Sequence, residues 1–370
     1  MKWKFYSLAF VAGMSILTAC SSDDNNDNDG NGGNGNGNEI ENGTILKGTI
    51  TSDVTLAAGN TYKLSGEYIV EEGGTLHIEE GVKIIAVYDD IADYILVKQG
   101  GKINAVGTPD KPIVMTSEKE EPGAWGGIHI CGRAHTNAEG GKGSSEIGGA
   151  VYGGNDDADN SGTLQYIRLE YTGFAFDEEH EANGISFYSV GNGTIVDHCQ
   201  AYKGSDDGFE FFGGSVNVSN LVAVSCSDDS FDWTEGWNGK GTNLVAYQEA
   251  ESTLGYDCDC LMECDNNGSN NAATPVAHPV LKNLILVGNG GSKQGIRLRA
   301  GTEVEIDNAK VCGKGQPLTV ETALTENALK NGTSKLTNIT LTSELSSKEG
   351  IYTHADFIAV TSNKVDANLS

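Results

Sequence analysis

The feature that most constrains the fold is an internal repeat in the middle of the chain. The segment DDGFEF at residues 206–211 returns as DDSFDW at residues 228–233, a displacement of 22 residues (228 − 206). A fixed period of this length is typical of solenoids, in which each repeat packs against its neighbours. Within each copy apolar and polar residues alternate, as in a strand with one side inward and the other toward solvent. The repeat therefore predicts a stack of coils built from short strands.

Related strands extend in both directions from this pair. A second strand, beginning with an Asn-like residue, precedes the first in every unit, so that the unit is strand, corner, strand. Clear copies of this second strand begin at Asn220, Asn243 and Asn283, with looser copies at Gln165 and Asp197. The units that begin at 165 and 243 are longer, and both insertions fall at the same corner. Solenoids usually place insertions on the face that binds something.

The rest of the body follows the same rule. The pattern of residues 68–78 is repeated in residues 94–103, and the Gly-Gly pairs of the two segments lie 27 residues apart (100 − 73). The high Gly count of 50 and the low Pro count of 6 favour β structure with many tight corners. We expect one all-β domain over 44–370, with an N-terminal cap strand over 45–56 and a C-terminal cap that contains a short helix over 321–329.

The N-terminus has the pattern of an export signal. Lys2 and Lys4 precede an apolar run that ends in Leu17-Thr18-Ala19-Cys20, which predicts a signal peptide over residues 1–20. Small residues followed by Cys20 resemble the lipobox of bacterial lipoproteins, and acylation of this Cys would hold the protein to a membrane by hydrophobic burial. The alternative is ordinary cleavage beside a chance cysteine.

Residues 21–43 contain almost no apolar side chain and predict a disordered tether rich in Asp, Asn and Gly. Asp23 and Asp24, just after the lipobox, resemble the acidic signal that directs Bacteroidetes lipoproteins to the outer face of the outer membrane. A random acidic linker is the alternative. We expect display at the cell surface.

The formal net charge of −28 limits the classes of ligand that the protein can bind. An acidic surface repels phosphate backbones, so no nucleic acid partner is expected. Metal ions, basic ligands and neutral or cationic glycans remain open, as does the simple alternative that the charge serves solubility.

The acidic residues of the repeat stack on one another. If the strands lie about 4.8 Å apart, Glu210, Asp232 and Glu263 become outward neighbours on consecutive coils. Two like charges 4 Å apart cost about 1 kcal/mol in water and about 4 kcal/mol at an effective dielectric of 20. We therefore expect one or more Ca²⁺ ions, bound by hard oxygen ligands. The candidate ligands are Asp206, Asp207, Glu210, Asp228, Asp229, Asp232 and Glu263.

Other remedies for this charge remain open. The carboxyl groups can take raised pKa values, or a basic partner can neutralise them. The sequence offers Arg297 with Arg299 at the end of the column, which cannot reach every acid. The carboxylates can also extend into solvent or cap the amides of the corner.

A second candidate calcium site precedes the repeat. Asp157, Asp159 and Ser161, followed by Gly162, have the oxygen spacing of a calcium loop, although Arg168 stands where an EF-hand has Glu. The leading alternative is an Asx-rich turn without an ion.

Several of these strings resemble Bacteroidetes cell-surface lipoproteins of unsettled function with a predicted right-handed parallel β-helix. The resemblance covers roughly residues 60–300 and rests on WGG at 125–127, YGG at 152–154 with the acidic run at 156–162, DDGFEFFGG at 206–214 and DDSFD at 228–232. It implies a right-handed parallel β-helix at the cell surface, and it implies no catalytic residues. The cysteine-rich segment 258–264 departs from the family pattern.

The expected function is binding of an extracellular glycan or peptide at the acidic corner. Trp237 lies past its strand and is expected to present an exposed ring to a sugar beside Glu235, with Arg297 and Arg299 as further ligand residues. A hydrolase with Asp207 and Asp229 as the acid and base, and Arg297 binding an acidic sugar, is the second interpretation. This order faintly resembles pectin-degrading β-helix hydrolases, but their Gly-His-Gly motif is missing. A purely structural protein or adhesin is the third.

The cysteines leave two alternatives. Seven remain after Cys20, an odd number for an exported chain. The cluster of Cys258, Cys260 and Cys264 could bind a metal through thiolates, although its spacing fits no zinc knuckle. A disulfide from this cluster to Cys226 is at least as well supported.

Overall fold

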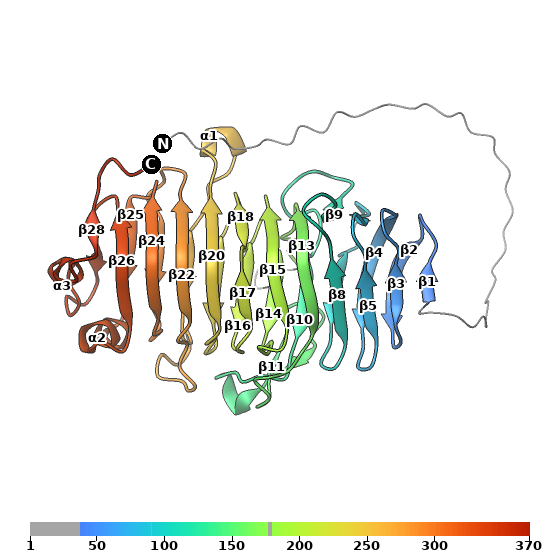
Figure 1. Cartoon of the computed structure of the whole chain (residues 1–370), viewed down its shortest axis with the longest axis horizontal. Helices are drawn as coiled ribbons and strands as arrows, with labels where there is room; N and C mark the ends of the chain where they lie inside the picture. Colours follow the sequence, from blue (N-terminus) through green and yellow to red (C-terminus); the bar gives the residue numbers. More distant parts are fainter. Residues whose placement is uncertain (1–37, 90, 177–179) are drawn as a thin grey trace, which may run out of the picture. The chain divides into compact units, whose positions relative to one another are not determined.

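Strands from successive coils pair in parallel along the whole described part of the chain (Figure 1). This computed structural model describes residues 38–89, 91–176 and 180–370. The predicted signal peptide, Cys20 and the tether up to residue 37 lie outside the described residues. Within them, no helix combines the length and apolar character needed to cross a membrane.

Each coil contributes strands to three parallel sheets, because the chain turns a corner after each strand. Six long strands pass from the first sheet into the second through a corner, namely β13 (Gly162–Glu170), β15 (Ile195–Tyr202), β20 (Lys240–Tyr247), β22 (Val280–Val287), β24 (Glu305–Cys312) and β26 (Lys335–Leu341). The first sheet also contains β1 (Asn38–Ile40), β3 (Val54–Leu56), β5 (Thr75–Ile78), β8 (Lys102–Val106) and β17 (Asn217–Ser219). The second sheet adds β6 (Lys83–Ala86), β9 (Ile113–Ser117), β18 (Val222–Val224) and β28 (Lys364–Val365).

The third sheet carries the acidic repeat. It contains β7 (Tyr94–Val97), β10 (Ile128–Cys131), β14 (Ile185–Tyr188), β16 (Phe209–Phe212), β19 (Phe231–Thr234), β21 (Met262–Cys264), β23 (Gln294–Leu298), β25 (Gln316–Val320) and β27 (Ser346–Ser347). Near the start of the stack, β2 (Ile45–Ile50) and β4 (Thr61–Val70) run through the second and third sheets. The predicted β-helix fold is confirmed, as is the 27-residue offset of the first coils, since Thr75 pairs with Lys102.

The two ends of the stack differ in detail from the sequence expectation. The strand expected over 45–56 is two strands, β2 and β3, which belong to a full coil and pair with β4 and β5. β1 pairs with β3, so residues 38–40, which were assigned to the tether, already form part of the stack. The expected C-terminal helix is α2 (Ala323–Asn331), joined by α3 (His354–Ala359). The Glu326 carboxylate accepts three backbone hydrogen bonds from residues 349–352, which ties α2 to the last coil.

The interior is a column of stacked apolar side chains. Phe187 lies on Phe211 with ring centroids 5.0 Å apart, and Phe209 lies on Phe231 at 5.6 Å. Equivalent positions of successive coils therefore stack like on like, and burial of this column of aliphatic and aromatic side chains stabilises the fold.

The repeated asparagines form a ladder at the corner between the first and second sheets. Asn220, Asn243, Asn283 and Asn308 all have a φ near +60°. The Nδ2 of each of the last three donates to the Oδ1 of the preceding coil's Asn at 2.8–3.0 Å, and Nδ2 of Asn220 donates to Oδ1 of Asp197 at 2.7 Å. Asn tolerates this left-handed conformation better than most residues. The looser copies were misaligned by one residue, because Tyr166 and His198, not Gln165 and Asp197, hold the equivalent left-handed position.

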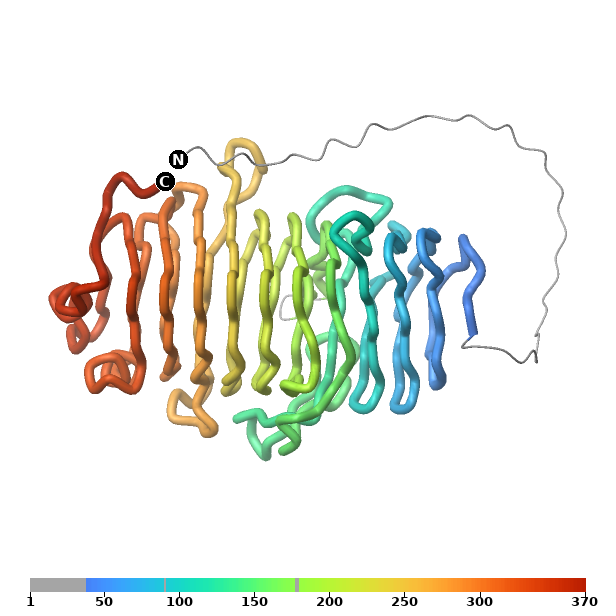
Figure 2. Tube along the Cα trace, in the orientation of Figure 1, coloured from blue at the N-terminus to red at the C-terminus, as the bar shows by residue number. Residues whose placement is uncertain are grey.

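Long loops leave the stack at two edges (Figure 2). The insertion between β13 and β14 and the insertion over 248–261, the latter with α1 (Glu251–Leu254), start from the one corner where they were expected. Two more leave after the third sheet, over 132–161 and 265–279. The loop over 132–161 contains η1 (Glu139–Gly141), β11 (Gly143–Ser144) and β12 (Val151–Tyr152). It packs Ile147 and Tyr152 against Tyr188 and Phe212 on the outer face of the third sheet, which gives that face a second apolar cluster.

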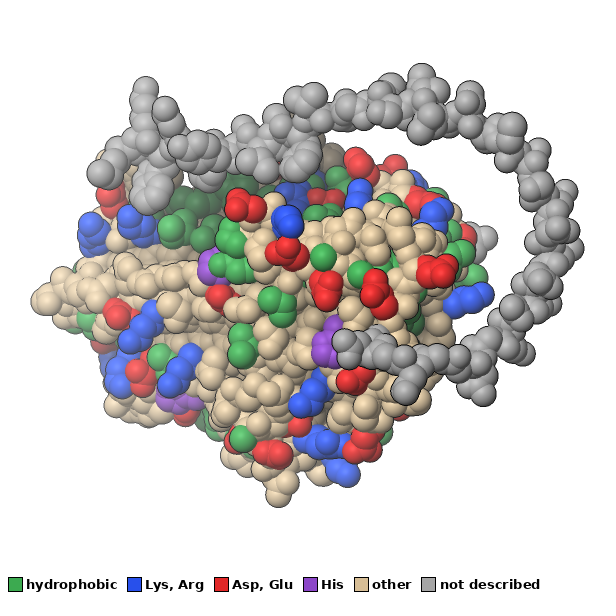
Figure 3. All heavy atoms as spheres, turned by 45° about the vertical axis from the view of Figure 1, so that its right-hand side comes forward, with side chains coloured by type: hydrophobic (Ala, Val, Ile, Leu, Met, Phe, Trp, Pro, Cys, Tyr) green, Lys and Arg blue, Asp and Glu red, His purple; other side chains and the backbone are tan. Residues whose placement is uncertain are grey.

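The acidic surface also contains many local ion pairs. Figure 3 shows Asp and Glu side chains mixed with Lys and Arg on one face. Lys63 with Glu118 at 2.8 Å and Lys98 with Glu71 at 2.7 Å are two such pairs near the start of the stack. Exposed pairs of this kind contribute little to stability.

Candidate metal centre

The outer face of the third sheet brings the acidic residues of the repeat together. The strand register places Glu210 beside Asp232, and Asp232 beside Glu263, on three successive coils. The stacking expected from the sequence is therefore confirmed. We call the set of Asp206, Asp207, Glu210, Asp228, Asp229, Asp232 and Glu263 the acidic ridge.

The carboxylate oxygens of the acidic ridge converge in three groups. In each group one oxygen from every member lies within 4.8 Å of the others. Two of the groups share Asp232, and the third lies at the corner before the strands. Their members are Asp207, Glu210 and Asp232; Asp229, Asp232 and Glu263; and Asp206, Asp207 and Asp228.

Asp207 and Asp229 also hold the corner together. They occupy equivalent positions two residues before β16 and β19, with 6% and 4% of their surface exposed. Oδ1 of Asp207 accepts a hydrogen bond from the Asp229 backbone N–H at 2.8 Å, and Oδ1 of Asp229 accepts one from the Cys260 backbone N–H at 2.6 Å. The amide-capping alternative is thus correct for one oxygen of each residue.

Electrostatics in the acidic ridge disfavour seven ionised carboxyl groups. Burial is the largest cause that raises the pKa of every member, and nearby carboxylates raise most of them further. The pKa of Asp206 rises to about 7 and that of Asp228 to about 6. Oδ1 of Asp232 is buried and has no hydrogen-bond partner. A buried carboxylate oxygen without a partner is costly unless a proton or a cation compensates it.

Two arginines neutralise one end of the acidic ridge. Nη1 of Arg297 lies 2.8 Å from Oε2 of Glu263, and Nη2 of Arg299 lies 2.8 Å from its Oε1. The same guanidinium groups also bind Glu321 and Asp265. As the sequence indicated, these cations lie at the end of the column, beside Glu263.

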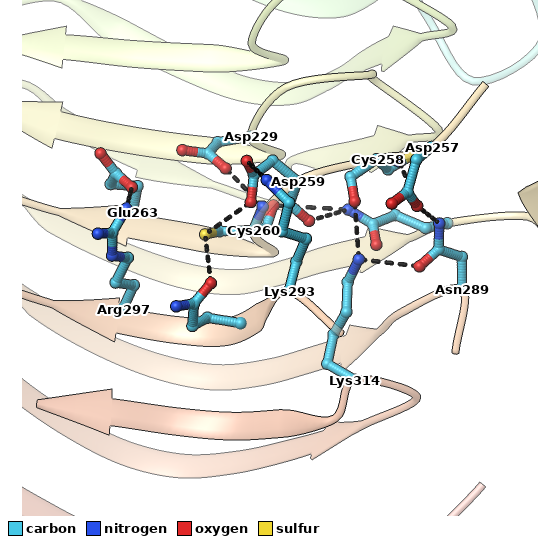
Figure 4. A network of polar contacts seen from close by, with 12 residues as sticks. Asp229, Asp257, Cys258, Asp259, Cys260, Glu263, Asn289, Lys293, Arg297 and Lys314 are labelled. Carbon is cyan, nitrogen blue, oxygen red and sulfur yellow. Dashed lines mark hydrogen bonds and ion pairs between the residues drawn. The ribbon is translucent and has the colours of Figure 1, made fainter. Parts of the chain in front are cut away.

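The cysteine-rich segment does not form either arrangement expected for it. All seven cysteines in the described residues are buried and free, so the proposed disulfide to Cys226 is wrong. The thiols of Cys258, Cys260 and Cys264 do not converge on one point in the described structure, since only Cys260 joins a group of possible metal ligands, together with Asp229 and Asp259. Asp259, which converges with Asp229 and Cys260, is ion-paired with Lys293 (Figure 4).

The second candidate calcium loop uses its oxygens in hydrogen bonds to the protein. Oδ1 of Asp157 accepts from the backbone N–H of His135 at 3.1 Å and contacts its Nδ1 at 2.6 Å. Oδ2 of Asp159 accepts from the Arg133 backbone N–H at 2.9 Å, and Ser161 is buried. Asx turns form within the same loop, since Oδ1 of Asp156 accepts from the Ala158 N–H at 3.2 Å and Oδ1 of Asn160 from the Gly162 N–H at 2.8 Å, as the alternative expected.

The proposed sugar platform is not on the surface. Trp237 is 1% exposed, stacks on Phe211 at 4.2 Å and donates from Nε1 to the Val216 carbonyl at 3.2 Å. The expectation of an exposed ring is wrong because the chain folds back into the coil after β19. Glu235 accepts hydrogen bonds from Thr136 and Tyr152 at 2.8 and 2.9 Å, so it anchors the loop over 132–161.

The sequence analysis did not identify two residues that lie beside the acidic ridge. Asn183 donates to Oε2 of Glu210 at 2.6 Å, and its Oδ1 accepts from the Asp207 backbone N–H at 3.2 Å. Its place two residues before β14 matches that of Asp207 and could have identified it. Glu146, which accepts from the Tyr188 hydroxyl at 3.3 Å, comes from the loop over 132–161 and has no repeat to mark it.

Parallel coils in three sheets define the class of right-handed parallel β-helix proteins, and in this chain the acidic ridge lies along one outer face. The chain matches the pectate-lyase-like β-helix domain over residues 48–369 and belongs to that family. No curated protein and no solved structure matches it.

Proposed function

We propose that this protein is a lipid-anchored surface module that binds Ca²⁺ at the acidic ridge and, through the ion, an extracellular polysaccharide. The observation that carries the proposal is that Asp232 belongs to two clusters of three converging carboxylates. Its Oδ1 is buried and has no hydrogen-bond partner. Ca²⁺ takes six to eight oxygen ligands and suits such a set of carboxylates.

The ion would supply what the acidic ridge lacks. Asp207 and Asp229 keep one oxygen on the corner amides and can offer the other, while Asp232 is free at Oδ1. Binding a cation lowers the energy of the ionised carboxylates, which otherwise take up protons as their raised pKa values indicate. The hypothesis therefore explains why so many acids are retained on neighbouring coils.

We infer a polysaccharide ligand from the description of the family as pectate-lyase-like, since pectate is a polysaccharide. A Ca²⁺ ion held on one side by protein carboxylates keeps positions for hydroxyl or carboxylate oxygens of a sugar. Arg297 and Arg299, with side chains 28% and 32% exposed beside Glu263, can donate to the same ligand. A peptide ligand is the competing outcome of a binding screen.

Calcium binding is tested by calorimetry on protein freed of metal with a chelator. The wild type should release or take up heat on addition of Ca²⁺. The Asp232→Asn variant should bind Ca²⁺ at least tenfold more weakly, because Asp232 belongs to both clusters of carboxylates. Asp307→Asn is the matched control, since this acid lies in the first sheet and bonds to Asn338. No heat with the wild type, or equal binding in both variants, contradicts the proposal.

Ligand binding and catalysis are separated on the same preparation. A polysaccharide array with and without Ca²⁺ should show calcium-dependent binding that Asp232→Asn removes. Release of reducing sugar that Asp229→Asn abolishes would instead establish the hydrolase in which Asp207 and Asp229 are the acid and base. Neither binding nor release would leave a structural protein or adhesin.

Anchoring at the outer membrane is a separate part of the proposal, supported by the lipobox at Cys20 and by Asp23 and Asp24. Labelled palmitate should enter the wild type and not Cys20→Ala. Protease added to intact cells should remove the anchored protein. Labelling that survives Cys20→Ala contradicts the anchor.

A further inference from the structure

Lys314 is a buried lysine outside the acidic ridge, and its amine is tightly held. The residue is 5% exposed, and Nζ donates to the Cys258 carbonyl at 2.9 Å and to Oδ1 of Asn289 at 2.8 Å (Figure 4). Its aliphatic chain passes over the backbone of Gly288, where an added Cβ would lie 2.5 Å from Cγ of Lys314. The coil is therefore shaped to bring this lysine to that asparagine.

A carboxylate completes the arrangement. Nδ2 of Asn289 donates to Oδ1 of Asp257 at 2.7 Å. Lys314 follows β24, Asn289 follows β22, and Asp257 lies in the insertion over 248–261. An amine, a carboxamide and a carboxylate from three successive coils thus meet in sequence at one corner, and the carboxylate contacts the nitrogen of the amide.

Burial of the amine makes its protonated form less stable than it would be in water, while the nearby Asp257 and Asp259 act in the opposite direction. Burial lowers the pKa of Lys314, as expected when the charged form is removed from water. Since the Asn289 C=O bond is about 1.2 Å long, a contact of 2.8 Å to Oδ1 places Nζ within about 4 Å of Cγ. Holding two reactants at such a distance replaces a bimolecular encounter by an intramolecular step.

We propose that Lys314 and Asn289 form an intramolecular isopeptide bond. Nζ of Lys314 attacks Cγ of Asn289, the Nζ–Cγ bond forms, and the Cγ–Nδ2 bond breaks. A proton is transferred from Nζ to Nδ2, which leaves as ammonia, and the Asp257 carboxylate that already contacts Nδ2 assists this transfer. The reaction exchanges one amide for another, so that it needs no oxidant, reductant or cofactor.

The bond would staple two neighbouring coils at the corner that carries the 248–261 insertion. Asn289 and Lys314 lie 25 residues apart in the sequence, so the link closes one coil of the stack. No disulfide reinforces this corner in the described structure, where Cys258 and Cys260 are both free. An amide link would therefore give this exported chain covalent reinforcement that is independent of redox conditions, and it does not depend on calcium.

Peptide mapping of the purified full chain tests the proposal without any variant. Trypsin cuts after Lys282, Lys293, Lys310 and Lys330, and cannot cut after a blocked Lys314. We expect one branched peptide that joins residues 283–293 to residues 311–330, with the summed mass less about 17 Da for the lost ammonia. Fragment ions should locate the bond between Asn289 and Lys314.

Variants show which groups the reaction requires. Lys314→Arg and Asn289→Ala should yield only linear peptides, and Asp257→Ala should reduce the branched fraction at least tenfold in a protein that still folds. Lys293→Arg is the matched control, because Lys293 pairs with Asp259 at the same corner and should leave the branched peptide intact. Separate, unmodified peptides from the wild type overturn the proposal. A loss of about 17 Da confined to peptide 283–293 also overturns it, since that marks cyclisation of Asn289 onto the Gly290 backbone.

Discussion

Oδ1 of Asp229 lies 2.6 Å from the backbone nitrogen of Cys260 on the next coil, and Oδ1 of Asp207 makes the same contact with the nitrogen of Asp229. One carboxylate therefore has two tasks, since it closes the corner with one oxygen and faces its acidic neighbours with the other. The hydrogen bond to the backbone stabilises the corner. The second oxygen adds to the negative charge of the acidic ridge, which a bound cation would neutralise.

Replacing Asp229 separates the two tasks. Asp229→Ala leaves the Cys260 N–H buried without an acceptor and should lower the free energy of unfolding by about 1–3 kcal/mol. Asp229→Asn keeps an acceptor, as Asn183 does for Asp207, and removes a negative charge, so metal-free protein at pH 8 should be as stable as the wild type or more stable. Denaturant unfolding in chelator measures both. An equal loss in the two variants would mean that capping is not the structural task.

The stability of metal-free protein should fall as the pH rises. The folded-state pKa values of Asp206 and Asp228 are raised to about 7 and about 6, above unfolded values near 4. Between about pH 4 and pH 7 the folded state binds more protons than the unfolded state, so the unfolding free energy decreases with pH. We expect a lower Tm at pH 8 than at pH 5 in chelator, and a larger gain from Ca²⁺ at pH 8.

Asp206→Asn isolates this effect. The variant lacks the group with the pKa of about 7, and its Tm should decrease less between pH 5 and pH 8 than that of the wild type. A wild-type Tm that rises over this interval in chelator, with no difference in the variant, would contradict the assignment.

Trp237 should behave as a core residue. It is 1% exposed and stacks on Phe211, so Trp237→Ala should lower the free energy of unfolding by about 3–5 kcal/mol. Trp237→Phe preserves the stacked ring and should cost less. Guanidinium unfolding followed by circular dichroism compares the two, and a stable Trp237→Ala with altered glycan binding would restore the surface interpretation.

The asparagine ladder should contribute at each coil. Asn243 has a φ of +58° and bonds to Asn220 and Asn283. Asn243→Ala loses both bonds and takes on a left-handed strain of about 1–2 kcal/mol, whereas Asn243→Gly loses the bonds without the strain. Unfolding experiments should therefore rank wild type, Gly and Ala in falling stability, and an Ala variant equal to Gly would remove the conformational part of the argument.

The repeat correctly predicted that the acids of successive coils lie side by side, because a solenoid brings residues at equal spacing in the sequence close together in space. Glu210, Asp232 and Glu263 could be placed side by side since each lies at the same point of its coil. Asn183 belongs to the same series and was missed because its coil carries a longer insertion. Trp237 was misplaced since alternation applies within a strand and ends where β19 ends.

By itself the sequence determined the coil, its period, the corner that takes two of the insertions and the column of acids, because these follow from local patterns repeated at a fixed interval. The tertiary structure alone decided how deeply the acids are buried, which of their oxygens are occupied and that Lys314 reaches Asn289. Those facts depend on side chains and loops from different coils that meet without any shared pattern. These contacts between coils determine how deeply a side chain is buried and which groups it bonds to. Burial and bonding in turn determine its charge, its pKa and its reactivity.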